Sequence, residues 1–544
     1  MKTIECVKWM WKVSGGVRWQ VALCTLLGFL HVAASLSFVW VCKKIVDLVT
    51  TDASASLLWY IISMVCCMLM QTIISAAESK VMSRAEIRMK NRLRHEIFSG
   101  LMGSRWDGKE NFHSGDVLNR MMEDVRVVSE AVVKSLPAVI TSGIKFLAAF
   151  IFLFILNPDL AWVIPGLMIV MLLLSRSYIR RMRKLNNEIR SSESNLQSLM
   201  QESLQYRVVI HTLERTSYIT DSVADHQEGL QTQVMNKADY SIFARSMVQI
   251  GFAAGYASAF LWGVFGIKAG TATFGMMTAF LQLVGQVQRP IMNLSRQLPS
   301  LINSLTSSER LDEVASIPSE STGDSVQMSS GAGLRFNDVT YTYPDSDTPV
   351  LQSFTYDFKP GTSTALLGET GIGKSTMIRL ILALLTPDKG TVELYDGQNT
   401  VSVSPQTRCN MIYVPQGNTL MSGTIRENLL LGDPSASDKQ LMDALHIAVA
   451  DFVMELPQGL DTICGEKGTG LSEGQAQRIS IARSLLRKGG ILLLDEPTAS
   501  LDSQTEELFL KRLSERLDGR TLILVTHRQA AASLCTHTLN LSTQ

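Results

Sequence analysis

The chain has 544 residues, more than one ordinary hydrophobic core accommodates, so at least two folded units are expected. A hydrophobic fraction of 46% and a mean hydropathy of +0.15 are high for a soluble protein. The net charge is zero, which excludes a global field that would attract nucleic acid or an acidic partner.

The cysteines show no C-x-x-C spacing and no nearby histidine cluster. Neither a metal site nor a disulfide framework is therefore expected. Reduced, packed thiols are predicted at Cys6, Cys24, Cys42, Cys66, Cys67, Cys409, Cys464 and Cys535.

Six largely uncharged apolar runs lie in the first 295 residues, and each reaches the roughly 20 residues that a helix needs to cross a bilayer. They cover residues 19–42, 57–77, 135–156, 159–178, 247–268 and 272–292. The first run has a basic start, as a signal peptide would. It is too long for a secretory core and further runs follow it, so cleavage is not expected. The pattern predicts an all-α membrane domain with six spans.

The connections after the second and fourth runs are long and basic. They contain SRAEIRMKNRLRHE (83–96) and SRSYIRRMRKLNNEIR (175–190). The positive-inside rule makes both segments cytoplasmic, together with both termini, although Lys43 and Lys44 fall near the outer face. Helical periodicity continues past the runs, so helices should project roughly 35–40 Å beyond the membrane.

Polar side chains within the runs leave alternatives open. Lys145 is costly in lipid and either selects an anionic amphiphile or pairs with a carbonyl or a neighbouring helix. Gln249, Gln282 and Gln286 either line a path or bond across helices. His31 is expected to be hydrogen-bonded rather than to bind a ligand.

From about Leu334 the pattern changes to short β-rich runs and amphipathic helices, after the polar stretch SIPSESTGDSVQMSSGAG (316–333). The chain is therefore divided into a transmembrane domain at 1–310, a linker at 311–333 and a soluble domain at 334–544. The soluble domain is predicted to be an α/β nucleotide-binding domain because of the loop described next.

A glycine-rich loop separates the buried-type strand STALL (363–367) from an apolar-striped helix. Glycines let backbone N–H groups point at phosphate oxygens, and the helix dipole adds positive potential. Lys374 reaches the β- and γ-phosphates, and the Ser375 hydroxyl ligates Mg²⁺. The motif predicts a nucleotide site formed by Gly368, Glu369, Thr370, Gly371, Ile372, Gly373, Lys374, Ser375 and Thr376.

The segment GGILLLDEPTASLD (489–502) contains an aliphatic strand that ends in two acids. Carboxylates at the C-terminal edge of a parallel strand lie beside a phosphate loop. Asp495 is predicted to hold Mg²⁺, directly or through water, and Glu496 to act as general base toward the attacking water.

The segment LSEGQAQRISIARSLL (471–486) is a polar turn that opens an amphipathic helix. Ser472 at the N-cap with Gln475 three residues later predicts a capping box. A capping box does not explain the flanking GEKGTG or the distance to Asp495. At this point the chain resembles the ATP-binding-cassette (ABC) transporter family, whose signature is usually L-S-G-G-Q. Leu471 to Gln475 match it at four of five positions.

The resemblance covers nearly the whole chain, because six spans and one cassette look like an exporter-type half-transporter. It implies ATP and Mg²⁺ as cofactors. In the family two cassettes close head to tail, so the resemblance implies a dimer, either of identical chains or with a similar half-transporter. The signature residues that would face the partner's γ-phosphate are Ser472, Gly474 and Gln475.

The resemblance assigns further roles. Tyr343 would stack on adenine, with Tyr341 as the competing candidate, and Asp502 in ASLD would belong to the nucleotide site. Gln416 would serve catalysis and Mg²⁺, and His527 would contact the γ-phosphate. Segments 109–124 and 201–215 resemble the coupling regions, and 462–468 resembles an exporter-specific loop.

Two departures from the family pattern stand out. Glu473 replaces the usual signature glycine, so its carboxylate either repels the anion or points away and favours the helix dipole. A competent site is expected in either case. The chain also ends soon after His527, where family members usually continue through further strands and a helix.

The resemblance implies an ATP-driven exporter of a hydrophobic or amphiphilic substrate, either lipid, drug or peptide, acting in the plasma membrane by alternating access. Membrane lipids are expected partners, and nucleic acid is not, because the basic stretches are juxtamembrane. The alternative is a nucleotide-gated regulator or channel of the same fold. Glu496 and His527 favour the exporter, since a binding-only switch needs no hydrolytic base.

Overall fold

The computed structural model describes residues 3–50, 57–106, 114–156, 158, 163–329, 331–369, 371–465, 468, 470–533 and 535–541. They form two compact units. The first unit contains Met1–Phe98 and Gly115–Ala315, and the second contains Ser99–Ser114 and Ser316–Gln544.

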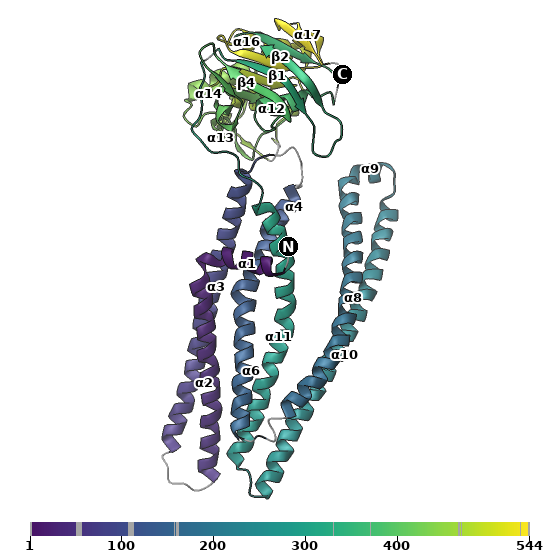
Figure 1. Ribbon diagram of the computed structural model, residues 1–544. Coiled ribbons are helices and arrows are strands. Elements are labelled where there is room, and N and C mark those ends of the chain that lie inside the picture. Colours follow the sequence, from purple (N-terminus) through teal and green to yellow (C-terminus); the bar gives the residue numbers. More distant parts are fainter. Residues whose placement is uncertain are drawn as a thin grey trace. The chain divides into compact units, whose positions relative to one another are not determined.

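The first unit is helical throughout its described residues, and several of its helices are far longer than a bilayer is thick (Figure 1). At 1.5 Å per residue, the 53 residues of α10 extend roughly 80 Å. The elements are α1 (Thr3–Val13), η1 (Ser14–Gly16), α2 (Arg18–Thr50), α3 (Leu57–Met102), α4 (Ser114–Asn119), η2 (Arg120–Asp124), α5 (Val125–Glu130), η3 (Ala131–Ser135), α6 (Leu136–Leu156), α8 (Val163–Gln205), α9 (Arg207–Thr212), α10 (Thr216–Lys268) and α11 (Phe274–Ala315).

Every predicted apolar run overlaps one of the long helices, except that residues 159–162 lie outside the described part of the chain. Four described segments are both long and apolar enough to cross a membrane: Arg18–Thr50, Leu57–Met102, Gly115–Leu156 and Thr216–Lys268. The apolar segment at the start of α11 is shorter, Phe274–Val287. The count of six spans therefore stays a prediction.

Helices α2, α6 and α11 pack on one another, and α8 runs beside α10 (Figure 1). A buried apolar cluster joins the first three, with Val39 from α2, Leu153 from α6 and Phe280 from α11. The Trp262 ring of α10 meets Phe280 edge-on, with the ring centroids 4.8 Å apart. The packing thus extends from α11 to α10. The cysteines are free thiols, and they are buried or half-buried except Cys66, which is exposed, so the prediction of a packed thiol is wrong at that position.

The helical stretch that leads into α6 contains two π-helical segments, η2 and η3. Asp124, at the end of η2, is buried but not unpaired. Its carboxylate accepts hydrogen bonds from Ser307 Oγ at 2.8 Å and from Arg310 at 2.6 Å, both on α11. Arg120 bonds Glu313 at 2.9 Å. These ties fix the far end of α11 against this stretch.

The second unit has a parallel sheet, an antiparallel sheet and flanking helices (Figure 1). The described strands order as β11-β3-β10-β9-β6 in the parallel sheet and as β2-β1-β4-β5 in the antiparallel sheet. The elements are β1 (Gly333–Tyr341), β2 (Leu351–Phe358), β3 (Ser363–Leu367), α12 (Lys374–Ile381), β4 (Lys389–Tyr395), β5 (Thr400–Ser402), η4 (Pro405–Asn410), β6 (Met411–Val414), β7 (Gly423–Thr424), α13 (Ile425–Leu430), α14 (Asp438–Ile447), η5 (Asp451–Glu455), η6 (Gly459–Asp461), β8 (Ile463–Cys464), α15 (Glu473–Leu485), β9 (Ile491–Asp495), α16 (Ser503–Ser514), β10 (Thr521–Val525), α17 (Gln529–Ala532) and β11 (His537–Asn540).

The central strands β3, β9 and β10 are buried along almost their whole length because apolar clusters cover both faces of the parallel sheet. Their carboxyl ends meet at one edge, where the loops after β3, β9 and β10 begin. The sheet therefore brings residues 368, 496 and 527, which are far apart in sequence, to the same place.

The segment between α11 and β1 differs from the predicted linker in two respects. Helix α11 continues through Ala315, past the predicted boundary at residue 310. The following residues are docked on η4: Glu320 forms two hydrogen bonds with Arg408, at 2.7 and 2.8 Å, and Asn410 donates to the Val326 carbonyl at 2.7 Å. Paired charge and backbone hydrogen bonds hold this polar stretch against the second unit.

Candidate functional site

The loop between β3 and α12 adopts backbone conformations that only glycine takes readily. Gly368, Gly371 and Gly373 have φ values of +153°, +89° and +107°. A Cβ on Gly373 would lie 3.0 Å from a Val350 methyl, and one on Gly368 would lie 2.9 Å from the Leu541 carbonyl oxygen. The loop is thus shaped as a bare backbone cradle at the N-terminus of α12, which suits an anionic phosphate.

Lys374 folds back over this loop. Its side chain is 7% exposed, and Nζ donates to the carbonyl oxygens of Gly368 at 2.5 Å and Glu369 at 3.2 Å. Burial lowers the pKa of Lys374, while the nearby charges of Glu496 and Asp495 oppose that shift. A phosphate entering the cradle would offer the ammonium group a stronger, charged partner than these carbonyls.

The other predicted loop residues frame this lysine. Ser375 is exposed, whereas Thr376 is buried, and the Ile372 N–H donates to Glu369 at 3.4 Å. Thr370 lies outside the described residues.

The two acids at the end of β9 have different surroundings. Asp495 is 8% exposed, and burial, reinforced by the charge of Glu496, raises its pKa. The Tyr413 hydroxyl donates a hydrogen bond to Asp495. Burial of Tyr413, together with the charge of Asp495, raises the pKa of Tyr413 to about 12. Glu496 has a left-handed backbone, with φ +48°. The buried acid suits a metal-binding role and the less buried one a role toward water.

Gln416, Glu496, His527 and Lys374 form one chain of polar contacts, in which Gln416 and His527 contact Glu496 and Lys374 contacts His527. Gln416 Nε2 donates to one carboxylate oxygen at 2.9 Å, and His527 Nε2 lies 2.8 Å from the other. The same His527 nitrogen is 3.1 Å from Lys374 Nζ. Residues 374, 416, 496 and 527 come from four separate segments, and the parallel sheet brings them together beside the cradle.

The two tyrosine candidates are separated by burial. Tyr341 is 5% exposed and packs in the core, whereas Tyr343 is half-buried and its hydroxyl lies 3.1 Å from Thr376 Oγ1. Arg379 of α12 donates to the same hydroxyl at 2.9 Å. Tyr343 is therefore the tyrosine that borders the phosphate loop, and the role of stacking on adenine stays a prediction.

The signature segment forms the predicted capping box. Gln475 N donates to Ser472 Oγ at 3.2 Å, and Ser472 N donates to Gln475 Oε1 at 2.9 Å. Glu473 points to the segment after β9, where its carboxylate accepts from Ser500 Oγ at 3.3 Å. Gly474 lies against the same segment.

Asp502 has a local structural role here. Its carboxylate caps α16 by accepting from the backbone N–H groups of Gln504 and Thr505 at 3.1 and 3.0 Å, and these bonds with the Thr505 hydroxyl lower its pKa. Gln477 is a buried residue of α15 beside Glu496, and the sequence analysis did not identify it.

Its spacing could have indicated it, because Gln477 lies four residues after Glu473 and therefore on the same helix face.

The donor set fits Mg²⁺ bound together with a nucleotide. Ser375, Asp495 and Gln416 supply a hydroxyl, a carboxylate and an amide oxygen, the hard oxygen ligands that Mg²⁺ prefers. Within the described chain no cluster of three or more His, Cys, Asp or Glu side chains could hold a metal alone. Mg²⁺ generally keeps several waters and binds through few protein ligands together with substrate phosphates.

Comparison with known proteins agrees with this geometry. The family described as ABC transporter transmembrane region matches residues 21–291, and the family described as ABC transporter matches residues 351–499. The fold is similar to a structure titled as a bacterial Atm1-family ABC exporter with ATP bound, with a TM-score of 0.80 and 22% identity, over 97% of this chain and 94% of that one.

Curated relatives have comparable overlap. An ABC transporter ATP-binding protein of Bacillus subtilis, YknV, is 30% identical over 425 residues, covering 76% of this chain and 69% of its own. ATP-binding cassette sub-family B member 10, mitochondrial, of Mus musculus is 29% identical, with 95% and 75% covered. The ATP-dependent lipid A-core flippase of Pseudomonas fluorescens (strain Pf0-1) is 27% identical, with 82% and 75% covered.

These matches confirm the predicted fold class, a helical transmembrane domain followed by an α/β ATPase domain, and the predicted multi-pass membrane protein that binds ATP. The chain belongs to the ABC transporter family, as an exporter-type half-transporter that couples ATP hydrolysis to transport.

Proposed function

We propose that this half-transporter exports a hydrophobic or amphiphilic substrate, either lipid, drug or peptide, across the plasma membrane by alternating access. The observation that carries the proposal is the hydrogen-bonded chain of Gln416, Glu496 and His527 beside the phosphate cradle. A membrane protein that only sensed nucleotide would not need a positioned base. The family's ATPase activity gives this chain an energy source for directional transport.

Each residue of the site has a proposed task. Lys374 leaves the carbonyls of its loop to hold the β- and γ-phosphates, and Tyr343 holds the adenine. Ser375 and Asp495 would hold Mg²⁺, which would neutralise phosphate charge when it is bound with ATP. Glu496 accepts the proton of the attacking water, while His527 contacts the γ-phosphate.

The second half of each ATP site is proposed to come from a partner chain. Ser472, exposed at the N-terminus of α15, makes its capping bonds within its own segment and leaves the positive end of α15 free for an anion of another chain. A homodimer is the simplest assembly, and a heterodimer with a similar half-transporter would satisfy the same geometry. Nucleotide binding closes the pair, and hydrolysis removes the contacts that favour closure.

The orientation is proposed from charge. The basic segments 83–96 and 175–190 and both termini lie on the cytoplasmic side, together with the ATPase domain. Of the two segments that resemble coupling regions, 201–215 includes α9, whereas residues 109–113 of the other lie outside the described chain. The segment 462–468, which resembles an exporter-specific loop, contains β8. Its residues 466 and 467 also lie outside the described part of the chain.

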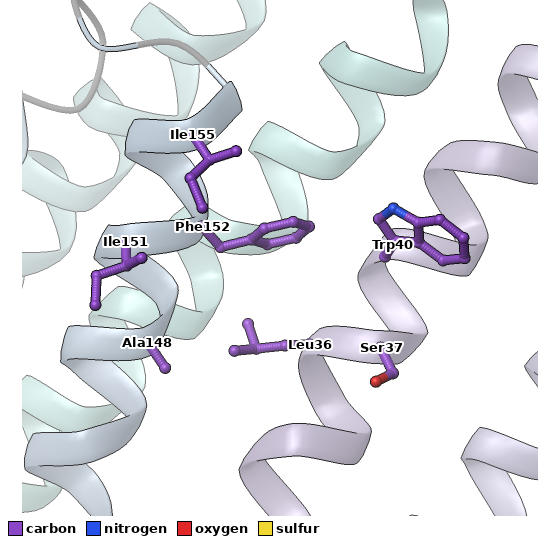
Figure 2. Close-up of a pocket in the computed structure, with 7 residues that line it drawn as sticks. All are labelled: Leu36, Ser37, Trp40, Ala148, Ile151, Phe152 and Ile155. Atoms are coloured by element: carbon purple, nitrogen blue, oxygen red, sulfur yellow. The ribbon is translucent and has the colours of Figure 1, made fainter.

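An apolar groove of about 420 Å³ between α2 and α6 supports an apolar substrate (Figure 2). In Figure 2, Phe152 extends from α6 toward Trp40 on α2, and Leu36 lies between the two helices. Lys145 precedes the groove residue Ala148 by one turn and interacts electrostatically with His31 of α2. The groove thus offers apolar surface next to a cation, which an amphiphile can use.

The test is Mg²⁺-dependent ATP hydrolysis by the full chain in lipid nanodiscs, measured for the wild type and Glu496→Gln. Lipids, hydrophobic drugs and peptides are added one class at a time. We expect the substitution to lower turnover by about 10²–10⁴-fold while ATP still binds, and one substrate class to stimulate the wild type. Turnover that survives in Glu496→Gln would refute the assigned base. Nucleotide binding without turnover would favour a gating function or an absent partner half.

A further inference from the structure

The signature helix α15 lies directly against the segment that follows β9. A Cβ on Gly474 would lie 2.9 Å from the Ser500 carbonyl oxygen and 3.6 Å from Leu501 Cδ2. The first turn of α15 therefore approaches backbone Glu496–Asp502 more closely than most side chains would allow. The segment begins with the base Glu496 and ends with the helix cap Asp502.

The side chain of Gln477 bridges both ends of the turn within this segment. It is 1% exposed. Its amide nitrogen donates to the Glu496 carbonyl oxygen at 3.4 Å, and its amide oxygen accepts from the Ser500 N–H at 3.3 Å. Both polar groups of a buried amide are thus paired, and both partners are backbone atoms of the segment that carries the base.

Glu496 needs such support because its backbone is left-handed, at φ +48°. For a residue other than glycine this conformation is unfavourable and persists where the surroundings fix it. The Glu496 N–H bonds the Val525 carbonyl at 3.1 Å, and its carbonyl also accepts from Ala499 at 3.3 Å. Gln477 supplies the side-chain bond from a different element, the signature helix.

Glu473 extends the same contact by one turn. It lies four residues before Gln477, so the two side chains share a helix face. Its carboxylate accepts the Ser500 hydroxyl at 3.3 Å, while Gln477 holds the Ser500 backbone. Glutamate stands where the family usually has glycine, so a side-chain bond at this point is a feature of this chain. The bond also directs the carboxylate away from the open end of α15.

We propose that Gln477 and Glu473 are positioning residues that hold the segment Glu496–Ser500 in the conformation that aims the base at its water. The inference rests on the proposed role of Glu496 as base. In a head-to-tail dimer, α15 serves the partner's nucleotide and Glu496 serves its own. The two side chains therefore connect the two ATP sites through one chain.

The first test is Gln477→Met in the full chain in nanodiscs, because methionine keeps the volume and removes both hydrogen bonds. We expect kcat to fall about ten- to a hundredfold while the KM for ATP changes less than about twofold. In a Glu496→Gln background, single-turnover hydrolysis should fall no further, since the positioned group is already gone. A loss of the same size in both backgrounds, or an unchanged kcat, would overturn the inference.

A second set of variants changes the exposed Glu473 and the half-buried Ser500, and it leaves the buried Gln477 intact. Glu473→Ala and Ser500→Ala should each lower kcat a few-fold, and together no further than either alone. Glu473→Gln keeps an acceptor for Ser500 and should restore most of the kcat lost in Glu473→Ala. Glu507→Ala, an exposed acid on α16, is the matched control. If Glu473→Gln behaves like Glu473→Ala, charge matters and the proposed hydrogen bond does not.

The two proposals fail in different ways. Hydrolysis that persists in Glu496→Gln would refute the role of Glu496 as base and with it the proposed function of the site. If hydrolysis is lost in Glu496→Gln but intact in Gln477→Met and in the Glu473 variants, only the positioning role of Gln477 and Glu473 is refuted.

Discussion

At the scale of single residues, hydrogen bonds within the chain hold the charged groups beside the phosphate loop. Lys374 donates to the carbonyls of its loop, and Glu496 lies between Gln416 and His527. These partners reduce the cost of burying the two charges. Binding of ATP must replace these internal bonds, and the charge state of Lys374 then determines how favourable that exchange is.

Lys374 should make ATP affinity fall at alkaline pH earlier than an ordinary lysine would. Burial lowers its pKa in the free protein from the usual 10.5. The sign is fixed by the bound state, because phosphate binds the protonated form. ATP affinity should thus be constant at neutral pH and decline as the pH rises through that lowered pKa, by up to about tenfold per pH unit.

The measurement is binding of a fluorescent ATP analogue between pH 7 and 10. Lys374→Arg keeps its charge throughout that range, so its affinity should show no such decline, whatever its absolute value. A wild-type affinity that stays flat up to pH 10 would contradict the lowered pKa.

At the scale of elements, the helices of the first unit combine membrane-length apolar runs with long polar continuations. The groove between α2 and α6 lies in the apolar part, whereas the Asp124 and Arg310 pair lies in the polar continuations. Small side chains on two adjacent long helices leave room for a surface concavity, and Ser37 and Ala148 both line this one. Such a concavity can be filled by a substituted side chain with little change elsewhere.

Ala148→Phe should fill the groove and reduce substrate stimulation. Ala148 is half-buried at the groove wall, so the added ring occupies the space that an apolar substrate would need. We expect the concentration for half-maximal stimulation of ATP hydrolysis to rise about tenfold, with the unstimulated rate within about twofold of wild type. Leu147→Phe, at an exposed position next to Ala148 in sequence, is the matched control. Equal effects of both substitutions would show that the groove is not the substrate site.

At the scale of the whole molecule, one chain provides one phosphate cradle and one signature helix. The cradle includes Lys374, and the signature includes Gly474, which cannot carry a larger side chain without displacing the Ser500 carbonyl. If the cradle of one chain works with the signature helix of its partner, a dimer of one cradle mutant and one signature mutant should keep one intact ATP site. If both parts of a site come from the same chain, that dimer should keep none.

Complementation tests the head-to-tail arrangement. Chains with Lys374→Ala and chains with Ser472→Arg are co-expressed with different tags, and the mixed dimer is purified. Ser472 is chosen in place of Gly474 because it is exposed at the N-terminus of α15, whereas a side chain at position 474 would disturb the Ser500 segment beside Glu496 of its own chain. In trans pairing, one site collects both defects and the other has none, so the mixed dimer should trap one nucleotide with vanadate. Each homodimer should trap none. A mixed dimer without trapping would favour sites formed within one chain, and tags that never co-purify would exclude the homodimer.

The sequence alone determined the class of the protein and predicted which residues form the ATP site. Glycines at 368, 371 and 373, the lysine that follows them and the acid pair at 495 and 496 are local patterns, because each depends on its immediate neighbours in a strand, loop or helix. The apolar runs predicted the long helices for the same reason.

The tertiary structure decided which residues meet across elements. The sequence favoured Tyr343 for the nucleotide and left Tyr341 as a competing candidate. Only packing shows that Tyr341 is in the core and that Tyr343 borders α12. The sequence left the direction of Glu473 open, and it missed Gln477 altogether, since both depend on the segment after β9 lying against α15. These contacts join residues distant in sequence, and the order of strands in the parallel sheet brings them together.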